Sequence, residues 1–287
     1  MEKLLQWSIA QQTGDKEAIA KAGTPDPKSL DQLFGLGGPD EPALMKQAII
    51  VATNPEATLE NQEIALENFE MLIENLDNAN NIENIKLWPS IISQLEPHVP
   101  TSLRVYAASI IGIAVQNNPL AQKAFLSHEQ GLKSLVLTAT PTEPKELYLK
   151  ALFAISSLIR NDEEACKKFL DIGGWKVVEF DNTVAAKQIL RVLSVLSAIL
   201  STGLDANKEK EIHSRGIVAE LVSVLQSSEP HVGCIDKVLN IVTQLHRLGF
   251  KFTASELEQL ESSVSGVLHL KDQLSEEDLE AVKTVWA

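Results

Sequence analysis

The sequence predicts an all-α protein made of stacked helical repeats, and three observations support this prediction. From about residue 43 onward, apolar side chains recur every three or four residues, which is the period of an amphipathic helix. No segment alternates strictly enough between apolar and polar residues to predict a strand. A block of sequence also recurs after 44 residues, with its apolar positions and the asparagine at its helix end retained.

The repeat is clearest where residues 103–126 are aligned with residues 147–170. A shift of 44 positions places Asn117 on Asn161 and superposes the apolar residues on both sides of them. The apolar matches are Leu103 with Leu147, Ala107 with Ala151, Ile111 with Ile155, Ala121 with Ala165, and Phe125 with Phe169. Weaker copies follow from a shift of 42 residues backward and 41 residues forward.

A period of 41–44 residues lies in the range of armadillo and HEAT repeats. Each unit is expected to contain a short helix, a second helix and a long third helix. Because its apolar residues lie on more than one side, a unit can bury them only against its neighbours. We therefore expect an armadillo-like α-solenoid of about four repeats. The long third helices are expected at about 60–76, 103–117, 145–161, 186–201 and 232–247.

Composition divides the chain into three expected parts. Residues 1–42 hold four of the 12 prolines and five of the 14 glycines, which is typical of a mobile linker. Within them, residues 3–12 predict a short amphipathic helix that either packs on the main body or presents its apolar face to a partner. Residues 43–250 would form the repeats with an N-terminal capping helix. Residues 251–287 would form acid-rich C-terminal capping helices.

Charge and hydropathy exclude several classes of function. The 287 residues carry a net charge of −14, which argues against nucleic-acid binding and against docking on an anionic membrane. A positively charged partner surface remains possible. The most apolar run, residues 189–200, contains Arg191 and is too short for the roughly 20 residues of a membrane span. With no signal peptide and only two cysteines, the sequence favours a cytoplasmic protein.

Catalysis is poorly supported by the sequence. The six histidines are scattered without metal-ligand spacing, and neither a nucleophile elbow nor a phosphate-binding loop is present. Lys167 and Lys168 could lower the thiol pKa of Cys166, but an ordinary unreactive thiol is the preferred interpretation. We expect no catalytic residue, no metal and no cofactor, and therefore no enzymatic activity.

The most unusual stretch is residues 56–85, which holds eight acidic residues and no lysine or arginine. Six of the carboxylates are spaced by three or four positions, which would place them along one face of one helix. These are Glu60, Glu63, Glu67, Glu70, Glu74 and Asp77. Like charges at this spacing cost about 0.2–0.5 kcal/mol per pair. The stripe is either a solvated acidic face or a surface that docks a basic partner.

Polar residues near the ends of the third helices are further candidates. The asparagine-rich segment 75–81 is either a turn between repeats or a contact site, where the small Ala79 would allow close approach. Arg160 ends a third helix, and Arg191 interrupts an apolar one. Each arginine either reaches the groove or pairs with a carboxylate inside the stack.

Four segments resemble the cytosolic fungal, armadillo-type nucleotide exchange factors of heat-shock protein 70 chaperones. They are LLQWSIA (4–10), PDPKSLDQLFGLGGPDEPALMKQAI (25–49), NFEMLIENLDNANNIENIKLW (68–88) and IIGIAVQNNPLAQKAFL (110–126). The resemblance covers most of the chain and weakens after about residue 170. It implies four armadillo repeats with helical flanks, whose third helices line a concave binding surface carrying an asparagine ladder.

The resemblance also implies a mechanism and a partner. The solenoid would bind the ATPase domain of the chaperone, open it and accelerate ADP release, which promotes release of bound substrate. A monomer would suffice for this action. The expected partner contacts are Asn75, Asn78, Ala79, Asn117, Arg160, Asn161 and Arg191, with Glu67, Glu70 and Glu74 as electrostatic support.

An armadillo adaptor or transport receptor that binds an extended basic peptide is the alternative. The asparagines with nearby acids could bind such a peptide. Transport receptors usually carry a tryptophan ladder beside the asparagines. None of the four tryptophans of this chain, Trp7, Trp88, Trp175 and Trp286, lies beside Asn75, Asn117 or Asn161.

Overall fold

The computed structural model describes residues 40–180 and 184–286. The chain divides into two units, residues 1–47 and 48–287, and only residues 40–47 of the first unit are described. Of these, residues 41–47 form the beginning of α4 (Glu41–Ala52). The predicted helix at 3–12 and almost all of the predicted linker lie outside the described residues. Every regular element of the described ranges is helical, which confirms the all-α prediction.

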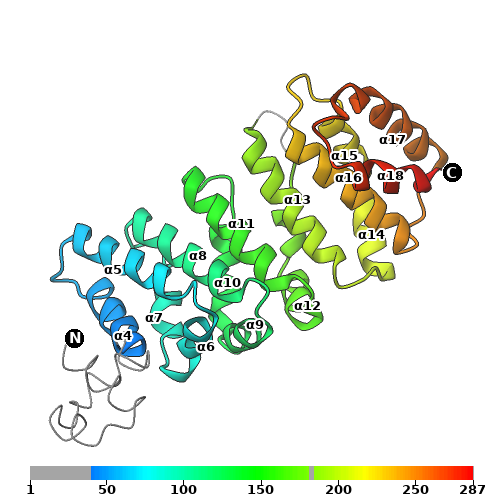
Figure 1. The fold of residues 1–287 in the computed structure, drawn as a ribbon. Helices are drawn as coiled ribbons and strands as arrows, with labels where there is room; N and C mark the ends of the chain where they lie inside the picture. Colours follow the sequence, from blue (N-terminus) through cyan, green and yellow to red (C-terminus); the bar gives the residue numbers. More distant parts are fainter. Residues whose placement is uncertain (1–39, 181–183, 287) are drawn as a thin grey trace, which may run out of the picture. The chain divides into compact units, whose positions relative to one another are not determined.

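The second unit is organised around a row of long helices (Figure 1). In the described ranges these are α5 (Leu59–Leu72), α8 (Thr101–Val115), α11 (Lys145–Ile159), α13 (Ala186–Leu200) and α16 (Val232–Arg247). Each packs against the next one along the chain. All five lie where the repeat period predicts a third helix, and the row confirms the armadillo-like α-solenoid.

Shorter helices connect the long ones. They are α6 (Leu76–Asn84), α7 (Trp88–Ser93), α9 (Pro119–Leu126), α10 (Glu129–Thr138), α12 (Glu163–Asp171), the 3-10 helix η1 (Gly174–Val177), α14 (Ala206–Ser214) and α15 (Ile217–Leu225). After α16 the chain forms α17 (Ala254–Val267), η2 (Leu268–Leu270), α18 (Glu276–Val282) and η3 (Lys283–Val285). α17 packs on α15, while α18 and η3 pack on α16, so these last helices cover the final repeat.

The core explains why the apolar positions recur. The matched residues Ala107 and Ile111 of α8, and Ala151 and Ile155 of α11, are all buried. At Gly112 the two helices approach so closely that an added Cβ atom would lie 2.5 Å from ring carbons of Phe153. Because a repeat buries these side chains only against its neighbours, the stack itself forms the hydrophobic core.

The asparagines that recur at the ends of the long helices act as stop residues. Asn117 and Asn161 have φ angles of 52° and 57°, in the left-handed region that asparagine tolerates better than most residues. Gly203 and Gly249, with φ angles of 85° and 81°, stand just after α13 and α16. A left-handed residue ends the helix because the chain can no longer continue its hydrogen-bond ladder.

The first long helix is shorter than the sequence predicts. α5 ends at Leu72 rather than near residue 76, because Asn75 starts a new helix: its side-chain Oδ1 accepts a hydrogen bond of 2.9 Å from the Asp77 backbone N–H. Glu74 therefore lies in the turn and Asp77 in the first turn of α6. The prediction that six carboxylates share one face of one helix is wrong, and only Glu60, Glu63, Glu67 and Glu70 lie on α5.

Candidate partner-binding face

The exposed sides of the five long helices form one surface, which we call the third-helix face. One row of equivalent positions crosses it: Tyr106, Lys150, Arg191 and Lys237, separated by 44, 41 and 46 residues. All four side chains are half-buried. The spacing matches the repeat period approximately, so α8, α11, α13 and α16 each contribute one residue to the row.

The side chain of each cation in this row contacts the preceding long helix. Lys150 Nζ donates to Ser109 Oγ of α8 at 2.8 Å, and the Arg191 guanidinium carbon lies 5.0 Å from the centroid of the Phe153 ring on α11. Lys237 Nζ donates to Ser197 Oγ of α13 at 3.1 Å. These contacts hold the positive head groups in place between adjacent repeats.

Acidic residues occupy the α5 end of the face. Burial, together with Glu67, Glu70, Glu63 and Glu146, raises the pKa of the Tyr106 hydroxyl. The Ser109 hydroxyl donates to Glu70 Oε1 while it accepts from Lys150. A carboxylate, a hydroxyl and an ammonium group thus join α5, α8 and α11 where the acidic part of the face meets the basic part.

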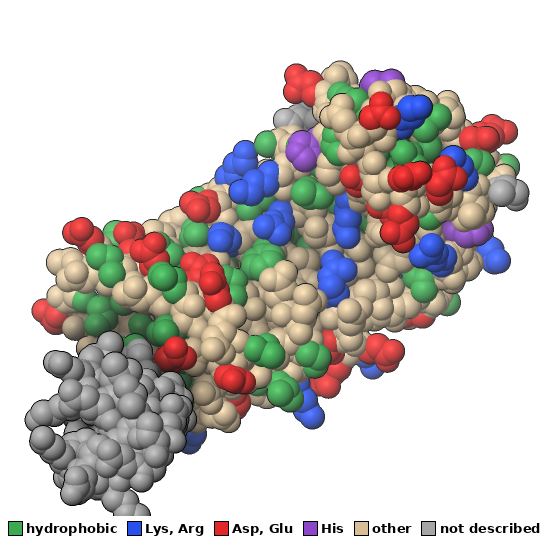
Figure 2. Space-filling view, viewed as in Figure 1, with side chains coloured by type: hydrophobic (Ala, Val, Ile, Leu, Met, Phe, Trp, Pro, Cys, Tyr) green, Lys and Arg blue, Asp and Glu red, His purple; other side chains and the backbone are tan. Residues whose placement is uncertain are grey.

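The middle of the face is basic. We call Lys150, Arg160, Arg191 and Lys237 the basic cluster. Arg160 donates from Nη2 to the Ser194 carbonyl oxygen at 3.2 Å. Burial lowers the pKa of the Lys237 ammonium, and the nearby Arg160 charge lowers it further, while Asp278 partly offsets both. Figure 2 shows lysine and arginine gathered over α11 and α13, with aspartate and glutamate over α5 and the C-terminal helices.

Both predicted arginines belong to this cluster. Within the described residues, neither Arg160 nor Arg191 forms an ion pair with a carboxylate. Burial lowers the pKa of each guanidinium. Of the two alternatives left open by the sequence, pairing inside the stack therefore finds no support among the described carboxylates. Both side chains keep part of their surface exposed on the face.

The predicted asparagines have structural partners of their own. Asn78 is buried and donates from Nδ2 to the Leu72 carbonyl oxygen at 2.9 Å, which fixes α6 against the end of α5. Asn75 caps α6, while Asn117 and Asn161 are exposed stop residues. A contact role for these four amides stays a prediction.

Ala79 lies in a cavity near the acidic end of the face. It is 3% exposed, and the cavity of about 360 Å³ is lined by residues of the α5–α6 turn, α6, and the C-terminal end of α8, among them Leu76, Ile113 and Gln116. Glu74 stands at the same cavity. A partner could therefore enter beside Ala79 more readily than it could contact its methyl group.

Two cations of the basic cluster, Lys150 and Lys237, are not among the residues predicted from the sequence. Lys150 aligns with Tyr106 at the 44-residue shift and with Arg191 at the 41-residue shift, so the repeat itself could have found it. Lys237 follows Arg191 by 46 residues, outside the predicted period. The repeat is clearest in the apolar positions, whereas the face is formed by the polar positions between them.

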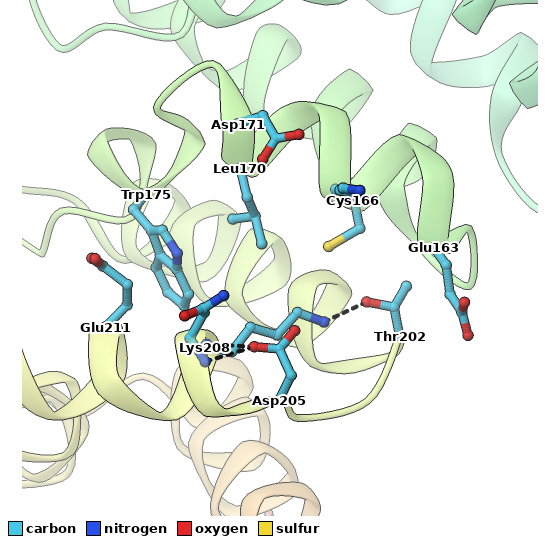
Figure 3. Close-up of a pocket in the computed structure, with 11 residues that line it drawn as sticks. Glu163, Cys166, Leu170, Asp171, Trp175, Thr202, Asp205, Lys208 and Glu211 are labelled. Atoms are coloured by element: carbon cyan, nitrogen blue, oxygen red, sulfur yellow. Dashed lines mark hydrogen bonds between the residues drawn. The ribbon is translucent and has the colours of Figure 1, made fainter.

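A second cavity, of about 550 Å³, lies between α12 and α14 (Figure 3). Cys166 is one of its lining residues, 1% exposed, and burial raises its thiol pKa. Lys208 donates to the carbonyl oxygens of Ile199 and Gly203, at 3.2 and 2.8 Å, and thereby caps the C-terminal end of α13. This geometry supports the unreactive-thiol interpretation of Cys166, because burial outweighs the hydrogen bond with Thr202 and the charge of Lys208, both of which lower its pKa.

The described residues offer little for catalysis. They contain no group of three or more histidine, cysteine or acidic side chains that could hold a metal ion. Lys150 donates a hydrogen bond to Ser109, a pairing that also occurs between a serine nucleophile and a lysine base. Ser109, however, is only 1% exposed, and its hydroxyl proton is donated to Glu70. A substrate cannot reach this hydroxyl. None of the described helices is both long and apolar enough for a membrane span.

Solved structures with the same arrangement define the fold class. A designed armadillo repeat protein in complex with peptide (KR)4 superposes with a TM-score of 0.65 at 13% identity, covering 86% of this chain and 100% of that one. A second designed armadillo repeat protein superposes with a TM-score of 0.67 at 12% identity, covering 84% and 98%. The chain is therefore an armadillo-repeat protein in fold.

Comparison with protein families is more specific. Residues 1–82 match the family "Nucleotide exchange factor Fes1", and residues 78–220 match the "SIL1/FES1/HPBP1 C-terminal domain". The Hsp70 nucleotide exchange factors FES1 of Debaryomyces hansenii and Scheffersomyces stipitis are 58% and 53% identical, each covering 99% of both chains. That of Saccharomyces cerevisiae is 45% identical over 99% of this chain and 100% of its own. The chain belongs to the Hsp70 nucleotide exchange factor FES1 family.

Family membership confirms the resemblance found in the sequence and extends it. The relatives cover 99% of this chain, so the similarity includes the part after residue 170, where the resemblance in the sequence is weaker.

Proposed function

We propose that this protein is a nucleotide exchange factor that binds the ATPase domain of a cytosolic heat-shock protein 70 through the third-helix face. Binding opens the domain and accelerates ADP release, after which ATP enters and bound substrate leaves. The observation that carries the proposal is full-length similarity to proteins named Hsp70 nucleotide exchange factor FES1.

The proposed action needs rigidity and no chemistry. A factor that binds the open, nucleotide-free form more tightly than the closed form shifts the population toward the open form. Coupling is reciprocal, so a hundredfold weakening of ADP binding requires about 2.8 kcal/mol of differential binding. The packed row of long helices, with the close contact of α8 and α11 at Gly112, offers a stiff template for this selection.

The contact residues proposed for this surface are those predicted from the sequence: Asn75, Asn78, Ala79, Asn117, Arg160, Asn161 and Arg191, supported by Glu67, Glu70 and Glu74. Access differs among them. Arg160 and Arg191 lie in the basic cluster, and Glu67 and Glu74 are exposed. Both Asn78 and Ala79 are buried. Ala79 would act by shaping the cavity between α6 and α8, and Asn78 would act through its hydrogen bond to the end of α5.

A stopped-flow assay of fluorescent-ADP release tests the function. The full chain should accelerate release from a cytosolic heat-shock protein 70 in proportion to its concentration. If no cytosolic heat-shock protein 70 responds, the proposed function is wrong.

A double variant tests the surface. Ala79→Arg would place a long cation in the cavity beside α8, and Arg191→Ala would remove a cation from the basic cluster. The combination should abolish acceleration while the helical circular dichroism remains. Unchanged ADP release with this variant would reject the proposed surface but leave the function in place.

We also propose that the protein acts in the cytoplasm as a monomer and without a catalytic step. Light scattering after size-exclusion chromatography should give the mass of one chain, 31.4 kDa. Cell fractionation should recover the protein with cytosolic markers. A dimer mass or a membrane-bound fraction would contradict these proposals.

The charge pattern of the face weighs against the alternative of a receptor for basic peptides. A cationic peptide lying along the face would meet the acids of α5 but would then cross the basic cluster, where like charges repel. Submicromolar binding of a basic localisation peptide would restore this alternative.

A further inference from the structure

The third-helix face carries an electrostatic imbalance that the fold does not resolve. The chain has 39 acidic and 25 basic residues, yet four cations share the middle of this face. Arg160 lies close enough to Lys237 for its charge to lower the Lys237 pKa. Gathering partly desolvated like charges raises the free energy of the unbound protein. Such an arrangement suggests a partner that supplies the missing negative charge.

Every head group of the basic cluster is held by a neutral group. Lys150 and Lys237 donate to the hydroxyl groups of Ser109 and Ser197. Arg160 donates to a backbone carbonyl, and Arg191 stacks on Phe153. These contacts orient the cations without neutralising them. Lys150 is linked to a carboxylate, Glu70, but that link runs through the Ser109 hydroxyl.

The two arginines retain capacity for recognition. A guanidinium has five N–H donors in a planar fork that matches a carboxylate. Within the described residues, Arg160 has one hydrogen bond to an acceptor, and Arg191 is placed by its aromatic contact. A cation–π contact with a ring leaves N–H donors of the guanidinium available for paired hydrogen bonds.

We propose that the basic cluster is a carboxylate-recognition site that binds an acidic patch on the surface of a protein partner. Arg160 and Arg191 supply paired hydrogen bonds to carboxylates, and Lys150 and Lys237 supply flanking positive charge. An acidic protein surface is favoured over nucleic acid because a net charge of −14 would repel a polyphosphate as a whole. The identity of the partner as a chaperone ATPase domain rests on the proposed function.

The acidic residues of α5 give this recognition a direction. Glu60, Glu63 and Glu67 lie on α5, the first helix of the row, and the basic cluster lies on α11, α13 and α16 further along it. A partner with an acidic patch opposite the cluster and a basic patch opposite α5 gains attraction at both places in one orientation. The reversed orientation brings like charges together, so the charge pattern selects the register of docking.

A matched pair of variants tests the cluster. The face variant Arg191→Gln with Lys237→Gln removes two charges and keeps hydrogen-bonding side chains. The control variant Lys123→Gln with Lys167→Gln removes the same charge from α9 and α12, at exposed positions related by the 44-residue shift. The circular dichroism of both variants should match that of the wild type, which shows that each retains its helical fold.

Association rates with full-length heat-shock protein 70 should be measured at about 50 mM and about 300 mM salt, since screening separates charge steering from other contacts. We expect the face variant to associate about tenfold or more slowly at low salt and to show a weaker salt dependence. The control should remain within about twofold of the wild type. Equal rates and equal salt dependence for both variants would overturn the recognition site, even if wild-type ADP release is accelerated as proposed.

A partner-independent assay separates this inference from the proposed function. A short fluorescent peptide with adjacent glutamates, a matched lysine peptide and single-stranded RNA would each be titrated against the full chain at low salt. The short glutamate peptide should bind because its few carboxylates meet the cluster without the repulsion that a long polyanion would meet, and the face variant should lose most of that binding while the control keeps it. Preference for the lysine peptide, or stronger binding of RNA, would overturn the inference. This result holds whether or not the protein proves to act on heat-shock protein 70.

Discussion

Arg104 on α8 and Glu143, just before α11, are joined by two hydrogen bonds of 3.0 and 2.7 Å between the guanidinium and the carboxylate. The Arg104 side chain is 7% exposed and that of Glu143 22%. Arg104 Nε also donates to the Leu95 carbonyl oxygen at 3.2 Å. One arginine thereby connects the end of the first repeat, the long helix of the second, and the chain entering the third.

Removing the two partners of this pair should have unequal effects on stability. Glu143→Gln leaves a buried guanidinium without its counter-charge, and we expect the free energy of unfolding to fall by about 3 kcal/mol. Arg104→Met leaves the more exposed carboxylate, which water can reach, so the loss should be smaller. Urea unfolding of both single variants and the double variant measures the difference and the coupling. Equal losses would contradict this account.

A pair of glycine substitutions tests the close approach of α8 and α11. In Gly112→Ala the new methyl would lie 2.5 Å from Phe153 ring carbons, so the helices must shift, at a cost of about 1–3 kcal/mol. At Gly266 in α17 an added Cβ would meet no heavy atom within 4 Å, and Gly266→Ala should add about 0.5–1 kcal/mol. Thermal unfolding should move in opposite directions. A stabilised Gly112→Ala would refute the contact.

Substitutions at Asn161 separate its role as a stop residue from its proposed contact role. Asn161→Ala forces a left-handed conformation on alanine and should cost about 1 kcal/mol. Asn161→Gly accepts that conformation and should unfold within about 0.5 kcal/mol of the wild type. If Asn161 also contacts the partner, Asn161→Gly should accelerate ADP release less than the wild type although its stability is unchanged. If Asn161→Gly accelerates ADP release as well as the wild type does, the Asn161 side chain serves only to end the helix.

The two tyrosines predict a specific alkaline behaviour. Burial is the leading cause that raises the pKa of both Tyr106 and Tyr148 above their ordinary value of 10.0. Because the folded protein then holds protons that the unfolded chain has released, its stability should fall as the pH rises above about 10. Ultraviolet titration of the folded protein should give phenolate midpoints above 10. In Glu67→Gln with Glu70→Gln, the Tyr106 midpoint should move back toward 10.

Both thiols should be protected in the folded protein. Cys166 and Cys234 are buried, and burial raises both thiol pKa values. If access requires local opening that costs about 3 kcal/mol, labelling by a thiol reagent at neutral pH is slowed more than a hundredfold. In denaturant, both thiols should react at once. Rapid labelling of Cys166 in the folded state would show that the cavity between α12 and α14 admits the reagent.

The long helices were predictable because burial imposes a repeat on the apolar positions. Ala107, Ala151 and their equivalents must be small or apolar wherever one repeat packs on the next. The end of α5 was not predictable from that pattern, since residues 60–76 keep helical spacing across the break. The capping side chain of Asn75 ends the helix there, and a cap leaves no periodic signal.

The site was predictable in part. Arg160 and Arg191 attract attention because they stand in apolar surroundings, and both belong to the basic cluster. Lys150 and Lys237 look like ordinary surface lysines in the sequence. Their significance appears only when the fold brings them beside Ser109 and Ser197 of the preceding helices. The role of Asn117 and Asn161 cannot be decided from the sequence for a related reason. A residue that ends a helix recurs in every repeat just as regularly as a residue that binds a partner.

The stop at Asn117 is followed at once by Asn118, whose side-chain Oδ1 accepts from the Ala121 N–H and starts α9. Asn161 and Asp162 repeat this pairing before α12. Because adjacent residues end α8 and α11 and start the helices that follow them, an insertion within either repeat need not shift the register of the next one. Errors in length stay within a single repeat, so individual repeats can change length during evolution while the rest of the array keeps its alignment.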